Sequence, residues 1–546
     1  MSVELDPGLS HRRGAAEPPL PEATVSADLA RTARAFPDHD ALVERASGRR
    51  WTYAALDAAV DELARGLLAA GVEAGDRVGI WSPNCAEWVL TQYAAARAGA
   101  ILVNLNPAYR QHEIAYALRQ SGTKLLVSAT RVKSSDYVAL VQAVRDDCPE
   151  LERVVFIGTP DWEALVEGGA AVPLSALRER EAELSPEDPA NIQYTSGTTG
   201  RPKGATLSHR NILGNGFQVA EVQRWTEQDR VCVPVPFYHC FGMVMANLGA
   251  TSHGSCIVVP GALFDPVDAL DAVQAERCTV LYGVPTMFIA ELAQLEAHPG
   301  RWDLSTLRTG VMAGSPCPVE VMKRVMAEMG MAEVTIAYGM TETSPVSTQT
   351  RPDDSLAHRV ATVGRVHPHV EVKVVEPESG ATVPVGTPGE LCTRGYSVML
   401  GYWNEPERTA EAVDAEGWMH TGDLAEMAAD GYVSIVGRIK DMVIRGGENV
   451  YPREVEEFLY THPDIEDVQV IGVPDERYGE ELMAWIKLRP GAAELTVEQV
   501  REFCAGKLAH YKIPRYVHLV DSFPMTVTGK IRKVEMREEG RRLLGL

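Results

Sequence analysis

The feature that most constrains the fold of this chain is its alternation of helical and strand patterns. The amphipathic stretch Tyr53–Ala70 is followed by the apolar run Arg77–Trp81, and a second helical stretch, Glu87–Ala98, comes next. Further strands are predicted at Ile101–Leu105, Leu125–Ser128 and Val154–Gly158. Strands separated by helices of this length indicate an α/β protein with largely parallel sheets. A chain of 546 residues is also long enough for two to four units with ample core.

Charge and cysteine content narrow the class of protein further. The net charge of −23 argues against nucleic-acid or anionic-membrane binding, because no basic face could dominate such a field. Nine cysteines without a C-x-x-C spacing predict neither a zinc site nor a disulfide framework. Residues 1–23 lack an apolar signal region, and their acids argue against a transit peptide. We therefore expect a disordered leader and a cytoplasmic protein.

A run without charge invites a transmembrane interpretation. Residues 231–264 contain no Asp, Glu, Lys or Arg over 34 positions. Three prolines and two histidines interrupt the run, however, which favours a buried strand–loop–helix–strand. We predict no transmembrane segment. The acid-rich stretch 161–187 is predicted to be a surface connection.

One glycine-rich stretch, Tyr194–Gly204, has the sequence YTSGTTGRPKG. Its glycines let the backbone bend close to a ligand and turn N–H groups toward an anion, and Lys203 adds a mobile positive charge. This composition predicts a phosphate-binding loop. It is not a Walker A loop, because Gly197 and Gly200 are too close together and no Ser or Thr follows the lysine. The alternative is an ordinary surface turn.

Two later stretches carry candidate chemistry. The stretch PFYHCFG holds His239, which is either a general base or a satisfied core histidine. The stretch AYGMTE ends in Thr341 and Glu342. Mg²⁺ favours one or two carboxylates plus phosphate oxygens, so Glu342 is a candidate ligand. The alternative for these two residues is a helix N-cap.

The C-terminal part has an α/β pattern of its own. A helix is predicted at Pro452–His462, strands at Val468–Val473 and Leu482–Leu488, and a second helix at Thr496–Lys507. A polar segment precedes this pattern and marks a domain boundary. The predicted division is a leader over 1–23, an N-terminal domain over 24–437, a hinge over 438–441 and a C-terminal domain over 442–546.

The order of the motifs resembles the series found in the adenylate-forming superfamily. That superfamily includes acyl-CoA synthetases, peptide-synthetase adenylation domains and beetle luciferases. The matching stretches are YTSGTTGRPKG, PFYHCFG, AGSP, YGMTE, TGD, GRIKDM, RGGENVYP and TGK, and the strings VMLGYWNEPERTAEAVD and GWMHTGDLA are typical of fatty acid–CoA ligases. The resemblance implies an α/β fold, with a large N-terminal domain of two sheet subdomains plus a β-barrel and a small, mobile C-terminal α+β domain.

The resemblance also implies a reaction in two steps. ATP and a carboxylate form an acyl-adenylate and pyrophosphate, and the thiol of coenzyme A then attacks the adenylate to give a thioester and AMP. The expected substrates are a fatty acid, with medium chains favoured, ATP and coenzyme A, and the expected metal is Mg²⁺. The expected oligomeric state is a monomer or homodimer.

The same resemblance assigns roles to residues of the nucleotide site. Lys530 would bridge the carboxylate and the α-phosphate in the transition state, Thr341 would contact the α-phosphate, and Glu342 would hold Mg²⁺. The residues assigned to ATP or AMP are Thr195, Ser196, Gly197, Thr198, Thr199, Gly200, Lys203, Gly314, Ser315, Pro316, Tyr338, Gly339, Asp423 and Arg438. Among these, Tyr338 and the turn at 314–316 would sandwich adenine, and Asp423 would accept both ribose hydroxyls.

The second step has its own assigned residues. Lys440 occupies the position of the family's hinge, and rotation there would bring Gly446 and Gly447 to the pantetheine tunnel. In the family His239 is an aromatic-type gate near the acyl carboxylate rather than a base. The candidate acyl pocket comprises Phe241, Val284, Val311 and Met340, although the sequence favours a core position for each of them.

Two other functions stay open from the sequence. An adenylating enzyme could load an acyl group onto a carrier protein, although the chain stops 16 residues after Lys530 and shows no carrier domain. A nucleotide-binding regulator without catalysis is a third possibility, against which stands the presence of Lys530, Glu342 and Asp423 together.

Overall fold

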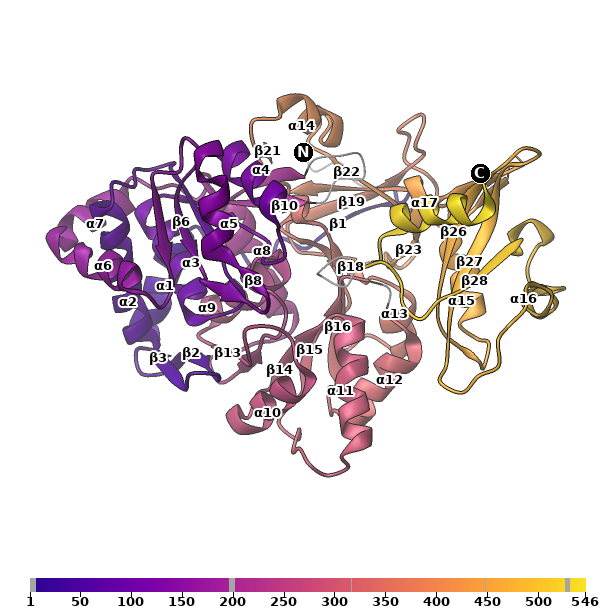
Figure 1. Cartoon of the computed structure of the whole chain (residues 1–546), viewed down its shortest axis with the longest axis horizontal. Helices are drawn as coiled ribbons and strands as arrows, with labels where there is room; N and C mark the ends of the chain where they lie inside the picture. Colours follow the sequence, from indigo (N-terminus) through magenta and orange to yellow (C-terminus); the bar gives the residue numbers. More distant parts are fainter. Residues whose placement is uncertain (1–5, 196–201, 316, 447, 526–530) are drawn as a thin grey trace. The chain divides into compact units, whose positions relative to one another are not determined.

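The computed structural model describes residues 6–195, 202–315, 317–446, 448–525 and 531–546 (Figure 1). The chain forms two compact units. The larger comprises residues 12–372 and 393–419, and the smaller comprises residues 373–392 and 420–546 with residues up to 11. The chain therefore leaves the larger unit after residue 372 and returns to it for one short segment.

A seven-stranded sheet in the larger unit has the order β21-β11-β10-β5-β4-β6-β9. The strands from β10 to β9 are parallel neighbours, as helix-separated strands predict. Strand β11 runs antiparallel to both β10 and β21. The bounds are β4 Arg77–Trp81, β5 Ile101–Asn104, β6 Thr123–Ser128, β9 Arg153–Phe156, β10 Pro189–Thr195, β11 Lys203–Ser208 and β21 Gly401–Tyr402.

The second sheet of the larger unit has nine strands in the order β18-β17-β16-β15-β14-β12-β13-β2-β3. Its central strands, from β16 to β2, are parallel. The bounds are β2 Asp40–Glu44, β3 Arg49–Thr52, β12 Arg230–Cys232, β13 Cys256–Val259, β14 Val280–Gly283, β15 Thr309–Ala313, β16 Glu333–Gly339, β17 Val346–Gln349 and β18 Arg365–Val366. The predicted α/β class with largely parallel sheets is confirmed.

The helices of this unit begin and end where local chemistry favours it. Helix α2, Tyr53–Ala69, begins after Thr52, whose hydroxyl accepts a hydrogen bond from the N–H of Ala55. Helix α3, Ala86–Ala98, ends at Gly99 in the left-handed conformation that glycine adopts without strain. The buried side chains of α2 recur every three or four residues, so one face packs into the core: Tyr53, Leu56, Val60, Leu63, Ala64, Leu67.

The charge-free run at 231–264 is a buried strand–loop–helix–strand, as predicted. Strand β12 is followed by a π-helix at Phe241–Leu248, a short α9 at Gly249–His253 and strand β13. Every residue of the π-helix is buried. No helix in the described part of the chain is long and apolar enough to cross a membrane.

The acid-rich stretch predicted as a surface connection folds as two helices. Helix α6 spans Pro160–Gly168 and α7 spans Leu174–Ala182, and each buries one leucine. The stretch therefore lies at the surface, and its helical content comes from local signals. The hydroxyl of Thr159 caps α6, and Pro160 occupies its first turn.

Two further sheets contribute most of their residues to the smaller unit. One places β19 Val370–Val375, β20 Gly389–Gly395, β22 Met419–Met427 and β23 Val433–Arg438 side by side in that order. The other pairs the long strands β26, Ile465–Asp475, and β27, Gly479–Leu488. Helices α15, Pro452–Leu459, and α16, Val497–Cys504, flank these strands in sequence. The predicted helix–strand–strand–helix order is confirmed.

Two parts of the predicted domain division differ from the structure. Residues 11–13, placed in a disordered leader, form strand β1, and the N–H of Ser10 donates to the carbonyl of Val383 at 2.9 Å. Such main-chain bonds do not depend on apolar side chains, so composition did not reveal them. Both sides of the predicted 438–441 hinge also fall in the smaller unit. The hinge itself stays a prediction.

Candidate active site

Glu342 is the centre of the best-defined cluster of predicted residues. It lies in a single 3₁₀ turn, Thr341–Thr343, directly after β16, and is 5% exposed. Its carboxylate oxygen Oε1 accepts a hydrogen bond from Thr195 Oγ1 at 3.2 Å and another from Tyr402 Oη at 2.9 Å. Its carbonyl accepts the N–H of Met399 at 2.9 Å. No lysine or arginine of the described chain forms an ion pair with this carboxylate.

Tyr402 is a residue of this cluster that the sequence interpretation missed. It lies on β21, which pairs with β11 so that Ala205 faces Tyr402. Burial and the nearby carboxylate of Glu342 raise the pKa of the Tyr402 phenol. Tyr402 therefore stays neutral and donates its proton to Glu342. The sequence carried it only as part of the string VMLGYWNEPERTAEAVD, in which nothing marks the tyrosine.

Lys203 also contacts Tyr402. Its Nζ lies 4.5 Å from the centre of the phenol ring and donates to Oη at 3.5 Å. The ring thus attracts the ammonium by a cation–π interaction while its hydroxyl faces Glu342. Tyr402 separates the cation of Lys203 from the carboxylate of Glu342, so neither charge neutralises the other directly.

The predicted phosphate loop lies between two paired strands. Thr195 ends β10, Lys203 begins β11, and the two residues face each other in the antiparallel register. The loop is therefore the connection of a hairpin. The predicted loop residues Ser196, Gly197, Thr198, Thr199 and Gly200 lie outside the described residues.

The predicted adenine-binding residues follow two neighbouring parallel strands. Gly314 and Ser315 come directly after β15, and Tyr338 and Gly339 end β16, which pairs with β15. A Cβ added to Gly339 would lie 1.7 Å from the carbonyl oxygen of Pro345, so only glycine fits there. Ligands of α/β sheets bind at the carboxyl ends of the strands, where these residues lie. Pro316 lies outside the described residues.

His239 and Thr341 lie on either side of a buried thiol. The Nδ1 atom of His239 accepts the N–H of Phe241 at 3.1 Å, which leaves the proton of a neutral imidazole on Nε2. Cys240 Sγ lies 3.6 Å from that Nδ1 and 3.9 Å from Thr341 Oγ1. This Nδ1 bond disfavours a general-base role through Nδ1.

The predicted acyl-pocket residues lie in one apolar region. Phe241 and Val311 belong to the main hydrophobic cluster of the larger unit, and Val284 and Met340 pack against it. The ring of Phe241 lies 5.4 Å from that of Tyr282. The structure therefore brings the four residues to the same cluster, which is also what core residues do.

In the smaller unit, Asp423 and Arg438 face each other across β22 and β23. Arg438 Nε donates to Asp423 Oδ1 at 3.0 Å. The side chain of Arg438 is 60% exposed and that of Asp423 is 14% exposed. The hydroxyl of Thr421 accepts the N–H of Asp423 at 3.1 Å and donates to the carbonyl of Leu391 at 2.6 Å, which fixes the part of β22 that carries the carboxylate.

The residues predicted for the second step also lie in the smaller unit. Lys440 is part of a 3₁₀ turn at Ile439–Asp441, and Arg537 Nη2 donates to its carbonyl at 3.3 Å. Gly446 has a φ of 62°, and its N–H donates to the carbonyl of Tyr478 at 2.8 Å. Gly447 and Lys530 lie outside the described residues.

Comparison with protein families defines the class. The chain matches the AMP-binding enzyme family over residues 29–403 and the C-terminal domain of AMP-binding enzymes over residues 454–530. It belongs to this family, and its fold is that of the adenylate-forming enzymes.

Individual relatives cover nearly the whole chain. The Bacillus subtilis protein YngI is 47% identical over 95% of this chain and 97% of its own length. The medium-chain acyl-CoA ligase ACSF2, mitochondrial, of Danio rerio is 43% identical over 98% of this chain and 91% of its own length. The crystal structure of ATP-bound MatB from Rhodopseudomonas palustris is 31% identical, with a TM-score of 0.84 over 95% of this chain and 99% of that one.

Proposed function

We propose that this chain is a fatty acid–CoA ligase that favours medium-chain acids and forms AMP. The observation that carries the proposal is the buried Glu342 carboxylate, held by Thr195 and Tyr402 beside the predicted phosphate loop in an AMP-binding enzyme. The preference for medium chains rests on the relatives named medium-chain acyl-CoA ligases.

The carboxylate of Glu342 suits a magnesium ion. Its carboxylate partners among the described residues are two neutral hydroxyls, so the negative charge is left for a cation, and Mg²⁺ prefers oxygen ligands shared with phosphates. Glu342 would hold the ion, and Tyr402 and Thr195 would orient the carboxylate. When bound, Mg²⁺ supplies neutralisation of phosphate charge.

In the first half-reaction a carboxylate oxygen attacks the α-phosphorus of ATP. The new P–O bond forms as the bond to pyrophosphate breaks, and the product is an acyl-adenylate. We assign the cradle of the departing pyrophosphate to Thr195, Lys203 and the loop between them, and contact with the α-phosphate to Thr341. Lys530 would bridge the two anions electrostatically.

The neutral part of the nucleotide is assigned to other residues. Tyr338 and Gly339 would contact adenine from one side and the turn that begins at Gly314 from the other. Asp423 would accept both ribose hydroxyls, and its bond from Arg438 Nε would keep the carboxylate in place.

In the second half-reaction the sulfur of coenzyme A attacks the acyl carbon. The C–S bond forms, AMP leaves, and the thiol proton passes to solvent. We propose that rotation at Lys440 separates the two half-reactions and that Gly446 and Gly447 admit the pantetheine arm. His239 would close the acyl site as a gate, and Phe241, Val284, Val311 and Met340 would line it.

A coupled assay tests the overall reaction. The protein is incubated with ATP, coenzyme A and straight-chain fatty acids of increasing length, and AMP, pyrophosphate and thioester are measured. We expect all three products, with the highest kcat/KM for medium chains. Turnover to ADP without AMP would refute the proposal, and activity with acyl-carrier protein but not with coenzyme A would favour a carrier-loading enzyme.

Two variants separate the half-reactions. Lys530→Ala should abolish adenylate formation yet retain thioester formation from supplied acyl-adenylate. Lys440→Pro, which restricts φ at the hinge, should retain adenylation and slow thioester formation. If both variants lose both steps equally, the proposal that two conformations serve the two half-reactions is wrong.

The cellular compartment of the protein is tested separately. We propose a cytoplasmic location, whereas several relatives are named mitochondrial. Fractionation of source cells, followed by immunoblotting of the native protein, decides between the two compartments.

A further inference from the structure

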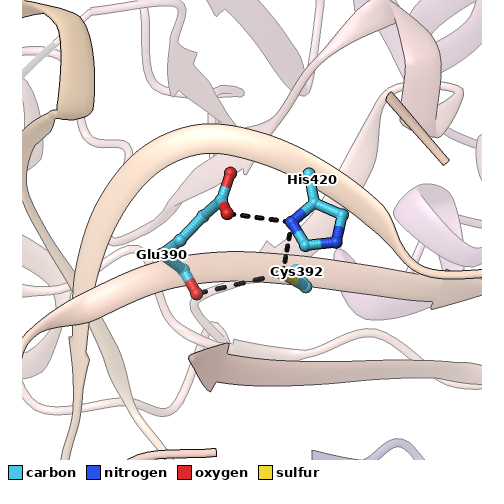
Figure 2. Close-up of side chains that lie close together, drawn as sticks. All are labelled: Glu390, Cys392 and His420. Atoms are coloured by element: carbon cyan, nitrogen blue, oxygen red, sulfur yellow. Dashed lines mark hydrogen bonds and ion pairs between the residues drawn. The ribbon is translucent and has the colours of Figure 1, made fainter. Parts of the chain in front are cut away.

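Three side chains outside the proposed nucleotide contacts point toward one another in the smaller unit (Figure 2). Glu390 and Cys392 come from β20, and His420 comes from β22. His420 Nδ1 lies 2.8 Å from Glu390 Oε2 and 3.5 Å from Cys392 Sγ. One potential ligand atom from each residue lies within 4.8 Å of the other two, and no second group of this kind occurs among the described residues.

The two strands fix this arrangement. Glu390 and Cys392 are two positions apart on β20, so their side chains leave the same face of the strand. Strand β22 is the neighbour of β20 in the sheet and presents His420 to that face. Ligands held on paired strands lose little freedom when a metal binds, which favours affinity.

The combination of donor types selects a class of metal. A carboxylate, a thiolate and an imidazole form a borderline-soft set that suits Zn²⁺, whereas Mg²⁺ and Ca²⁺ prefer oxygen alone. Zinc bonds of ~2.0–2.3 Å in a tetrahedron place ligand atoms roughly 3.3–3.7 Å apart. The Cys392–His420 distance already meets this range, and the Glu390–His420 distance needs to open by about half an ångström.

The surroundings expose His420 to solvent and hold the Glu390 carboxylate in place. The side chain of His420 is 32% exposed and that of Glu390 is 11% exposed, while Cys392 is buried. The second carboxylate oxygen of Glu390, Oε1, accepts the N–H of Gly422 at 3.0 Å. That bond orients Oε2 toward His420, as outer partners of metal ligands do.

We propose that Glu390, Cys392 and His420 bind a Zn²⁺-class cation, with water at the fourth position. On binding, the S–H bond of Cys392 breaks and a sulfur–metal bond forms, and the proton goes to solvent. The hydrogen bond between His420 Nδ1 and Glu390 is replaced by bonds from both residues to the metal, so Nδ1 gives up its proton to solvent and the bound, neutral imidazole carries its one proton on Nε2.

The site adjoins the part of β22, residues 421–423, that carries Asp423. Glu390 holds the N–H of Gly422, and the hydroxyl of Thr421 is bonded to Leu391, between the two ligands of β20. Moving the Glu390 carboxylate toward a metal therefore displaces this part of β22. This consequence rests on the proposed function of Asp423 as the ribose-binding residue, and it makes Zn²⁺ an inhibitor of adenylate formation.

Cobalt spectroscopy of the full chain tests the site directly. The protein is freed of metal by chelation and titrated with Co²⁺, which gives a thiolate-to-cobalt charge-transfer band when a cysteine binds. We expect one equivalent of Co²⁺ to produce this band and Zn²⁺ to remove it, because Zn²⁺ binds such ligands more tightly than Co²⁺.

Variants identify the ligands. Cys392→Ser should lose the band, and His420→Gln should retain a thiol but bind Co²⁺ more weakly by more than about 100-fold, beyond the effect of outer-shell changes. Cys240→Ser is the matched control, because Cys240 also lies beside a histidine nitrogen, at 3.6 Å, and its loss should leave the band unchanged. Absence of the band in the unaltered protein, or an unchanged affinity in His420→Gln, would overturn the site.

An activity assay tests the effect of Zn²⁺ on adenylate formation separately from the cobalt titration. ATP–pyrophosphate exchange is compared with and without Zn²⁺ in the unaltered protein and in His420→Gln. We expect Zn²⁺ to slow exchange only in the former. Equal inhibition of both proteins overturns the coupling to Asp423. Absence of exchange in metal-free protein with Mg²⁺ overturns the proposed function, and the cobalt band still decides the site.

Discussion

Glu342 in the larger unit and Asp423 in the smaller unit are two carboxylates with opposite partners. Glu342 is 5% exposed, and among the described residues its carboxylate accepts hydroxyl donors only, from Thr195 and Tyr402. Asp423 lies at a more exposed position and accepts a guanidinium donor from Arg438 at 3.0 Å. Both carboxylates were assigned to the same nucleotide. Their different hydrogen-bond partners therefore indicate that they bind different parts of it.

The hydrogen-bond partners of each carboxylate indicate which kind of ligand it suits. A buried carboxylate without a cation has a large unmet demand for positive charge, which a metal ion can satisfy. A carboxylate already paired with arginine has less need of a cation and suits a neutral diol. The larger unit therefore supplies an unneutralised charge, and the smaller unit supplies a neutralised one.

The largest expected effect is that of Glu342→Gln. The amide keeps the size of the side chain but removes the charge that a magnesium ion needs. We expect kcat for ATP–pyrophosphate exchange to fall by about 10²–10³-fold, as for other groups that stabilise transition-state charge. Exchange is measured over a range of Mg²⁺ concentrations, and a normal rate at any of them would contradict the assignment.

Asp423→Asn should have a smaller and different effect. The amide accepts one ribose hydroxyl but loses the charged hydrogen bond, at ~1.5–3 kcal/mol. We expect KM for ATP to rise about 10–100-fold while kcat changes little. If kcat falls as far as in Glu342→Gln, the two carboxylates do not differ in the way proposed.

Tyr402→Phe should show the next effect, because it removes one of the two donors to Glu342. We expect the Mg²⁺ concentration for half-maximal exchange to rise about three- to tenfold, equivalent to a hydrogen bond of ~1 kcal/mol. Tyr194→Phe is the matched control, since the Tyr194 hydroxyl bonds Ala117 and Gln120 instead of a carboxylate in the cluster. If the Mg²⁺ concentration for half-maximal exchange rises equally in both variants, Tyr402 has no specific role in the site.

Glu291 is a third carboxyl group for this comparison, and it has no hydrogen-bond partner among the described residues. It lies on α11, Pro285–Ala297, is 1% exposed, and neither carboxyl oxygen has a hydrogen-bond partner in the described part of the chain. Burial raises the pKa of Glu291 well above its ordinary value. The folded chain therefore holds this proton more tightly than the unfolded chain. Its contribution to stability is complete below the ordinary carboxyl pKa and is lost as the pH rises toward the raised pKa.

We expect Glu291→Gln to remove the loss of stability that accompanies rising pH. The free energy of unfolding should increase by about 1 kcal/mol at neutral pH. Urea unfolding is measured between about pH 5 and about pH 8, where the variant should show a flatter pH dependence. Glu296→Gln, on the exposed face of the same helix, is the control and should not change the slope. A parallel pH dependence in Glu291→Gln and the unaltered protein would contradict an unpaired, protonated Glu291.

The sequence predicted those features that depend on local pattern. The strand Arg77–Trp81 was located to the residue, and the buried run at 231–264 was separated from a transmembrane helix by its prolines. Glu342 and Asp423 were assigned through motif resemblance, and their contrast in partners was not foreseen.

The features that were missed depend on distant pairing. Tyr402 reaches Glu342 only because β21 pairs with β11, and strand β1 forms by pairing with β19, more than 350 positions further along the chain. The group of Glu390, Cys392 and His420 was also missed, because a search for metal spacing in the sequence requires ligands close along the chain. These contacts join residues 30 to 374 positions apart, as His420 with Glu390 and Ser10 with Pro384 show.

The two-residue strand β21 has a consequence for synthesis of the chain. It covers the edge of β11, yet residues 401 and 402 leave the ribosome only after almost three quarters of the 546 residues have been made. Until then the nascent larger unit exposes an unpaired strand edge, which is a template for association with other chains. Translation that stops before β21 therefore yields a product that lacks both this protection and the hydroxyl that holds Glu342.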